Sequence, residues 1–215
     1  MQENKEVLEY LMSVVDEAER LFSGDPLAEK SDVVEYEFEF PENRIDEKSC
    51  MECPLWKSRM GREEYINFPT AKVLCITGAA EPGKAVLKPD ALTMYENQMT
   101  NVLGLQRSQR ALVSLIKCPT DTFSREYADK CKPLLKADMA KFSPRIIILF
   151  GTDVARYMLR QEGPFDNIRA SVRKRPWHLN GIPLFVTYSQ RECITNPSLK
   201  KAVFEDLKAI KEGLK

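Results

Sequence analysis

The sequence predicts a three-layer α/β/α fold around a four-stranded parallel sheet, preceded by an N-terminal helix and strand. Strand patterns alternate with helix patterns from residue 72 onward, which is typical of a parallel sheet with helices on both faces. The segment 145–150 is rich in isoleucine, as a strand buried on both faces should be. A length of 215 residues fits one domain with an extension.

We divide the chain into an acidic N-terminal extension, residues 1–46, and a globular domain, residues 47–215. Residues 3–22 place apolar side chains at helical spacing and end before Pro26, so we expect a helix there. Residues 35–40 alternate strictly between charged and aromatic side chains, which predicts a half-buried strand.

Within the globular domain, each predicted strand is followed by a predicted helix. We expect strands at 72–77, 111–116, 145–150 and 184–188, and helices at 90–103, 125–141, 151–161 and 197–214. Pro133 should kink or divide the second of these helices, because proline cannot donate the helical hydrogen bond. Ligands in such folds bind at the carboxyl ends of the strands. The loops 78–89, 117–124, 151–153 and 188–196 are therefore the expected binding region.

The net charge of +0 conceals a strong asymmetry. Residues 1–50 carry 15 acidic and 5 basic side chains, a balance of −10, and residues 51–215 carry 17 acidic and 27 basic, a balance of +10. One interpretation is an acidic, solvated extension on a slightly basic body; the other is a body that binds an anionic polymer. Neither a secretory signal nor a long apolar run is present, so we expect a cytoplasmic protein without membrane contact.

Four of the six cysteines are spaced like ligands of a metal or an iron–sulfur cluster. They are Cys50 and Cys53, which are separated by two residues, and then Cys118 and Cys131. Cytosolic cysteines at such spacing more often bind metal than form disulfides. A zinc site would more often show a second close pair or a histidine pair, although chance and core packing remain an alternative. We interpret Cys75 and Cys193 as non-ligands.

Two further motifs each have a structural and a functional interpretation. The Gly78–Gly83 loop is either a tight turn or a cradle for a phosphate or a base edge, and it lacks the Gly-Lys-Ser/Thr of a P-loop. The run Arg173-Lys174-Arg175 before Pro176-Trp177-His178 is either a nucleic-acid surface or a solvated loop beside a packed tryptophan. His178, the single histidine, has no catalytic partner in the sequence, which favours a structural or surface role.

Several segments between Cys50 and the C-terminus form a recognisable set. They are Cys50-Met51-Glu52-Cys53-Pro54-Leu55, Met99–Leu105, Leu115–Pro119, Cys131–Leu135, Pro144–Gly151, Arg173–Tyr188 and Asn196–Lys200. Together these segments resemble the iron–sulfur (family-4 type) uracil-DNA glycosylases. The resemblance implies a uracil-DNA glycosylase-like fold, a [4Fe–4S] cluster on Cys50, Cys53, Cys118 and Cys131, and DNA as the partner.

The chain departs from the family pattern at the positions that carry the chemistry. The family's acidic residue after the first strand is displaced to Glu81, and its uracil-stacking aromatic falls near Lys88. Its uracil-reading asparagine aligns with Ser114, and its final His-Pro is replaced after Tyr188 by Ser189-Gln190. The resemblance thus implies Glu81 as the catalytic carboxylate and a base pocket formed by Gly78, Gly83, Lys88, Ser114 and Ser189.

Two functions follow from this comparison. The first is a divergent glycosylase of DNA repair that hydrolyses the bond to uracil or another damaged base in a rewired pocket. The second is a non-catalytic relative that binds DNA or a protein partner. In either case we expect Arg173, Lys174, Arg175 and Arg191 to contact double- or single-stranded DNA. We also expect a monomer, with residues 1–46 available to a protein partner.

Overall fold

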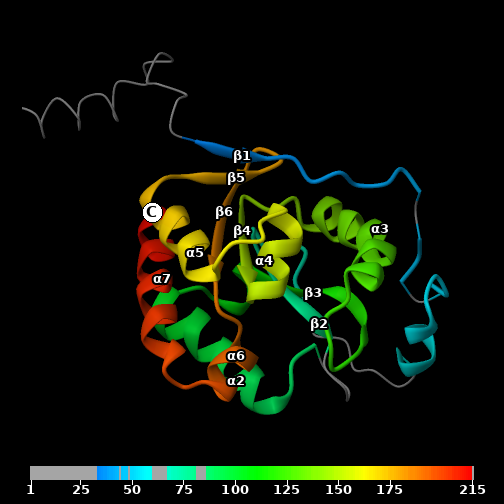
Figure 1. The fold of residues 1–215 in the computed structure, drawn as a ribbon, viewed down its shortest axis with the longest axis horizontal. Helices are drawn as coiled ribbons and strands as arrows, with labels where there is room; N and C mark the ends of the chain where they lie inside the picture. Colours follow the sequence, from blue (N-terminus) through cyan, green and yellow to red (C-terminus); the bar gives the residue numbers. More distant parts are fainter. Residues whose placement is uncertain (1–32, 44, 48, 60–66, 81–85, 215) are drawn as a thin grey trace, which may run out of the picture. The chain divides into compact units, whose positions relative to one another are not determined.

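One sheet of six strands, in the order β1-β5-β6-β4-β2-β3, organises the structure (Figure 1). The structure is a computed structural model and describes residues 33–43, 45–47, 49–59, 67–80 and 86–214. Residues Val34–Lys215 form one compact unit. The helix expected at 3–22 lies outside the described residues. No described helix has the length and apolar character needed to cross a membrane.

The four predicted strands are all present and run parallel to one another. They are β2 (Val73–Ala80), β3 (Arg110–Pro119), β4 (Ile146–Phe150) and β6 (Ile182–Thr187). The prediction of a four-stranded sheet was nevertheless wrong, because β5 (Trp177–Leu179) and β1 (Val34–Tyr36) extend the sheet beyond β6. β1 overlaps the start of the strand expected at 35–40 and is shorter than expected. β5 runs antiparallel to β6, and β1 pairs parallel with β5, so the sheet is mixed.

A two-residue turn creates the additional antiparallel pair. Asn180 and Gly181 join β5 to β6, with φ of 49° and 75°. Positive φ at both positions is the requirement of a type I′ hairpin turn, for which Asn-Gly is the preferred sequence. The Asn180 side chain then accepts from the Phe38 amide at 2.7 Å and donates to the Phe38 carbonyl at 3.0 Å. This turn therefore also holds the segment that follows β1.

Helices cover both faces of the sheet, as expected for three layers. One face carries α3 (Arg125–Phe142), α4 (Thr152–Leu159) and α5 (Phe165–Lys174). The other carries α2 (Pro89–Asn97), the π-helix η2 (Gln98–Leu103), α6 (Gln190–Thr195) and α7 (Leu199–Gly213). α5 and α6 were not predicted, the predicted helix at 90–103 divides into α2 and η2, and α3 continues through Pro133.

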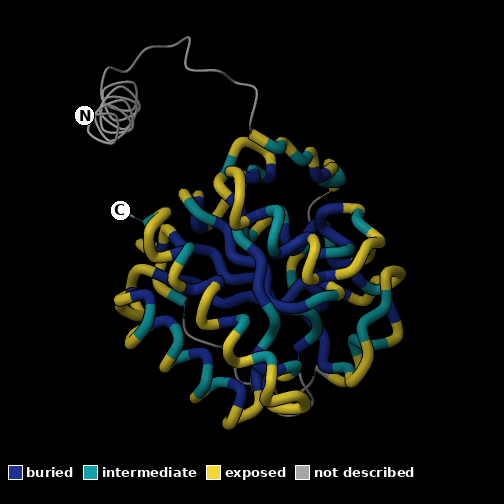
Figure 2. The backbone as a smooth tube through the Cα atoms, turned by 60° about the vertical axis from the view of Figure 1, so that its left-hand side comes forward, coloured by how far each residue is buried: buried dark blue, intermediate teal, exposed yellow. Residues whose placement is uncertain are grey.

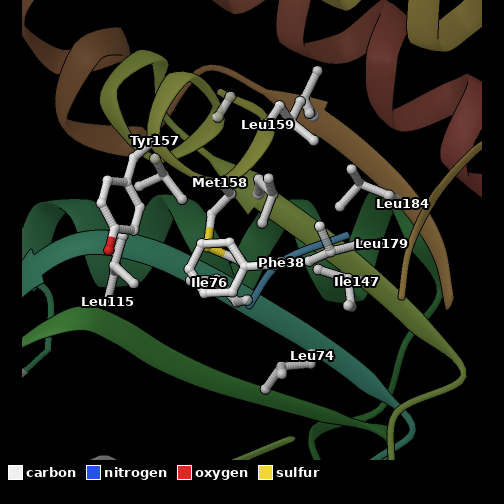
Figure 3. Close-up of a cluster of buried hydrophobic side chains, with 14 of the residues drawn as sticks. Phe38, Leu74, Ile76, Leu115, Ile147, Tyr157, Met158, Leu159, Leu179 and Leu184 are labelled. Carbon is white, nitrogen blue, oxygen red and sulfur yellow. The ribbon is translucent and has the colours of Figure 1, made fainter. Parts of the chain in front are cut away.

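The core consists of two apolar clusters separated by the sheet. Figure 2 shows the strands as buried and the outer sides of the helices as exposed. In the cluster of Figure 3, Phe38 lies among side chains of the sheet and of α4, and its ring meets that of Tyr157 edge to face at 5.8 Å. The N-terminal segment is thus anchored in the same core as Leu74 and Ile147.

All ten residues of β3 are buried, although β3 lies at the end of the sheet. The segment before β2 covers its free edge. The side-chain amide of Asn67 donates to the Leu112 carbonyl at 2.9 Å and accepts from the Leu112 amide at 2.8 Å, as a neighbouring strand would. Ser58, in the 3-10 helix η1 (Pro54–Arg59), donates to the Pro119 carbonyl at 3.1 Å. Edge strands need such cover to avoid pairing with other chains.

A buried ion pair connects α5, α7 and the end of β6. Asp206 is 2% exposed and accepts from Arg169 Nε at 2.7 Å and from Thr187 Oγ1 at 2.8 Å. Arg169 also contacts Asp166 at 2.5 Å, and Asp166 accepts from the Tyr188 hydroxyl at 3.0 Å. These contacts fix the carboxyl end of β6, from which the loop 188–196 departs.

We expect Asp206→Ala to lower the free energy of unfolding by about 3–5 kcal/mol, because it leaves the buried Arg169 guanidinium without its main partner. Urea denaturation followed by circular dichroism measures the change. The control is Glu205→Ala, which removes an exposed contact of 3.3 Å to Arg173; we expect about 0–1 kcal/mol there. Equal effects of the two substitutions would contradict the interpretation.

Candidate active site

A cavity of about 380 Å³ lies at the carboxyl ends of β2 and β4. Each of the four loops expected to form the binding region contributes to its lining. Among the described residues, the lining is Thr77, Gly78, Ala79, Leu87, Asp121, Phe123, Phe150, Gly151, Thr152, Asp153, Val154, Ser189, Arg191, Glu192, Thr195, Asn196 and Leu199. A cavity is therefore present where the binding region was expected, and its use as a ligand site stays a prediction.

Gly151 forms the sharp turn from β4 into α4 at the base of the cavity. Its φ of 108° is unfavourable for residues with a side chain. A Cβ at this position would lie 3.4 Å from Ser189 Cβ and 3.6 Å from Glu192 Oε2. The Gly151 amide donates to the Thr187 carbonyl at 2.8 Å, which ties the ends of β4 and β6 together. The positive φ therefore requires glycine at this turn, whereas a Cβ would meet the next loop only at ordinary van der Waals distances.

The Glu192 carboxylate joins the two loops that meet at Gly151. One oxygen accepts from the Thr152 amide at 3.1 Å, at the start of α4. The other accepts from the Ser189 amide at 2.7 Å and from the Ser189 hydroxyl at 2.8 Å. The Ser189 hydroxyl in turn accepts from the Glu192 amide at 3.2 Å, which completes a capping box at the start of α6.

Two further carboxylates and two aromatic rings line the cavity. Burial raises the pKa of Asp153, and the nearby charge of Glu192 raises it further, against the opposing effect of Arg156. Asp121 lies in the loop after β3 and is exposed. Phe150 is fully buried, and the ring of Phe123 meets that of Tyr157 edge to face at 6.0 Å. The site thus combines acidic groups with apolar walls.

The base-pocket residues proposed from the sequence have different locations. Gly78 and Ser189 line the cavity. Ser114 does not: it is 1% exposed, and its hydroxyl oxygen has no hydrogen-bond partner among the described residues. Lys88 is exposed at the N-terminus of α2 and is not among the lining residues. Glu81 and Gly83 lie outside the described residues.

The residues proposed to contact DNA also separate into two groups. Arg191 lines the cavity and is exposed. Arg173, Lys174 and Arg175 lie at the end of α5, away from the cavity lining, and Arg173 contacts Glu205 and Asp206 of α7. Trp177 is packed against Tyr36 with 4.8 Å between ring centroids. His178, in β5, lies 3.7 Å from Glu35, which agrees with a structural or surface role.

The sequence analysis did not single out Asp121, Phe123, Asp153 or Glu192 as site residues. For the first three, the only signal was their position in the expected loops. Glu192 carried a stronger one, because Ser189 and Glu192 match the Ser-x-x-Glu pattern of a capping box. Gln190, which follows Ser189, is buried and donates to Gln98 of η2 at 2.7 Å. It therefore anchors α6 and does not line the cavity.

The four candidate ligand cysteines are all buried. Burial raises the pKa of the Cys131 thiol, and the charges of Cys53 and Cys50 raise it further. A backbone hydrogen bond from Lys117, the residue before Cys118, opposes this shift. Cys131 of α3 therefore lies within electrostatic reach of the N-terminal pair and beside the end of β3.

The four buried thiols have the donor type and number that a [4Fe–4S] cluster uses. Among the described residues, no group of three or more His, Cys, Asp or Glu side chains could hold a metal ion. A [4Fe–4S] cluster takes four thiolates, each bound to a different iron, so its ligands surround a volume and need not converge on one point. Buried thiols from three separate segments match that donor set.

We expect Glu192→Ala to lower the free energy of unfolding by about 1–3 kcal/mol, because a charged acceptor for two backbone amides is lost. The loops at Thr152 and Ser189 should also exchange amide hydrogens faster. Chemical denaturation and hydrogen exchange measure the two effects. Glu42→Ala, at an exposed position outside the site, is the control and should stay within about 0.5 kcal/mol of the wild type. Unchanged exchange at both loops would contradict the role of Glu192.

Comparison with known proteins identifies the family of the chain that forms this cavity. The model of the uracil DNA glycosylase superfamily matches residues 65–208. A type-4 uracil-DNA glycosylase of Sulfurisphaera tokodaii is 26% identical over 177 residues, covering 76% of this chain and 80% of the relative. One of Saccharolobus solfataricus is 25% identical over 178 residues, covering 78% and 82%. The chain that forms this cavity therefore belongs to the uracil-DNA glycosylase superfamily.

Proposed function

We propose that this protein hydrolyses the N-glycosidic bond between a damaged base and its sugar in DNA. The observation that carries the proposal is the cavity at the ends of β2 and β4, where carboxylates and an aromatic ring lie together in a member of this superfamily. The similarity to two type-4 uracil-DNA glycosylases supports uracil or a related base as the substrate.

Such an enzyme must extrude the base from the duplex and hold it in a pocket. Phe123 offers a ring for stacking, and the buried Phe150 forms an apolar wall. Gly78 also lines the cavity, and a Cβ there would lie 3.8 Å from the Phe123 ring, so the absence of a side chain leaves room beside that ring. Phe123 therefore takes the stacking role for which Lys88 is unsuited.

A carboxylate then activates the attacking water. Of the three acidic residues in the described lining, Glu192 is already engaged by Thr152 and Ser189. Asp153 has a raised pKa, which makes it a better proton acceptor near neutral pH than an ordinary carboxylate. We assign the role to Asp153, with Glu81 as the alternative that the sequence resemblance implies.

The loop after β6 is the rewired part of the pocket. The Ser189 hydroxyl donates to Glu192 and therefore has no proton left for a departing base. This contact is also the observation that favours the second function, a glycosylase-like protein that binds DNA without cleaving it. Release of no base from any damaged duplex, together with intact DNA binding, would support that second function.

We also propose that Cys50, Cys53, Cys118 and Cys131 hold a [4Fe–4S] cluster. All four thiols are buried, and Cys50 and Cys53 lie close enough to Cys131 to influence its pKa. Four thiolates are also the ligand set that such clusters use. A bound cluster would fix the segment 50–59 to the end of β3 and to α3.

Arg191 at the cavity and the basic end of α5 are proposed to contact DNA phosphates. A monomeric state and a protein partner for residues 1–46 stay predictions.

We expect Asp153→Asn to slow base release by about 10²–10⁴-fold, because it removes the proton acceptor. The wild-type rate should rise with pH through the raised pKa of Asp153, above the usual range near 4, and this rise should be absent in the variant. Single-turnover assays on oligonucleotides with one damaged base measure both effects. Glu126→Gln is the exposed control, and Glu81→Ala is measured in parallel. Loss of activity in Glu81→Ala alone would transfer the role to Glu81.

We expect Cys131→Ser to lower the iron and sulfide content and to weaken the brown absorption of the anaerobically purified protein. The physical reason is the loss of one of four thiolate ligands. Cys193→Ser is the matched control, since Cys193 is also fully buried but lies in α6, at the cavity end of the sheet. Equal iron content in both variants, or a colourless zinc-loaded wild type, would contradict the cluster.

A further inference from the structure

The charges that line the cavity suit a cationic base better than an anionic one. Asp121, Asp153 and Glu192 contribute three acidic side chains, and Arg191 is the single basic residue of the lining that the structure describes. The negative charge of Glu192 already disfavours ionisation of Asp153. A further negative charge in this space would meet the same repulsion, whereas a positive charge would be attracted.

Hydrolysis of a uracil nucleotide develops negative charge on the departing base, which a preorganised donor or cation must stabilise. Ser189, in the loop after β6, directs its hydroxyl to Glu192, and Gln190 directs its amide nitrogen to Gln98. The sole histidine, His178, lies in β5 beside Glu35. The side chains of Ser189, Gln190 and His178 are therefore directed to other partners and do not supply a donor to a departing anion.

We propose that the preferred substrate is an N-alkylated purine that carries a positive charge, such as 7-methylguanine in DNA. This inference rests on the proposed glycosylase function and names its substrate class. The cationic ring would lie against Phe123, since aromatic faces attract cations. Asp121 and Asp153 would complement its charge.

The chemistry of this substrate removes the need for a donor to the leaving group. The bond between C1′ of the sugar and N9 of the purine breaks, and its electron pair stays on the purine. The methylated purine entered with a positive charge and therefore leaves as a neutral base. Water adds to C1′, and its proton passes to a carboxylate and then to solvent. The positive charge that develops on the sugar is the only one that the site must stabilise, and carboxylates suit that task.

The first test compares base release from matched duplexes with a single 7-methylguanine or a single uracil. The full-length, cluster-loaded protein is used under single-turnover conditions, and a reaction without protein corrects for spontaneous loss of the methylated base. We expect release of 7-methylguanine to be at least about tenfold faster than release of uracil. Equal or faster release of uracil would overturn the substrate class while leaving the glycosylase function intact.

The second test measures recognition without cleavage, so that loss of catalysis does not hide the result. The probe is a duplex with 2′-fluoro-7-methylguanosine, whose fluorine slows bond breaking, and the comparison is the same duplex with 2′-fluoroguanosine. We expect about tenfold tighter binding of the cationic probe, reduced by Asp121→Asn and unchanged by Glu42→Gln. Equal affinity for the two duplexes would overturn the inference. Tighter binding without release of any base would support it and would refute only the hydrolysis.

Discussion

The Glu192 carboxylate is the contact on which the shape of the candidate site depends. It binds the first amide of α4 and the amide that precedes α6, two segments that follow different strands of the sheet. Gly151 makes this possible, since its φ of 108° is one that residues with a side chain rarely adopt. The buried ion pair of Arg169 and Asp206 also supports the loop after β6, because Asp206 accepts a hydrogen bond from Thr187 at the end of that strand. The Glu192 carboxylate lines the cavity, but its hydrogen bonds serve to hold the loops in place.

One loop connects the candidate ligand cysteines with the cavity. Cys118 lies near the end of β3 and Cys131 in α3, and the loop between these elements contributes Asp121 and Phe123 to the cavity lining. The cluster proposed above would therefore hold both ends of this loop. It would also fix the segment before β2 to the last strand of the sheet.

The four parallel strands and the location of the cavity were predictable from the sequence, because apolar strands such as 145–150 leave little doubt about their burial. The extra hairpin was missed although Asn180-Gly181 is a strong turn signal, since three-residue strands carry too short a pattern to be recognised. The roles of individual loop residues were harder. Ser114 was expected to read the base but is buried, and Phe123 reaches the cavity from a loop whose course depends on tertiary contacts with Tyr157.

The side chain of Asn67 imitates a strand that the fold does not contain. Its amide satisfies both backbone groups of Leu112 at the free edge of β3. The ten residues of β3 are all buried, and most of them are apolar. A protein that lost this cover during synthesis or after oxidation of its cysteines would present an apolar strand to other chains. Asn67 and Ser58 therefore bear on solubility, and the cluster proposed above, which would hold the segment 50–59, would act against aggregation.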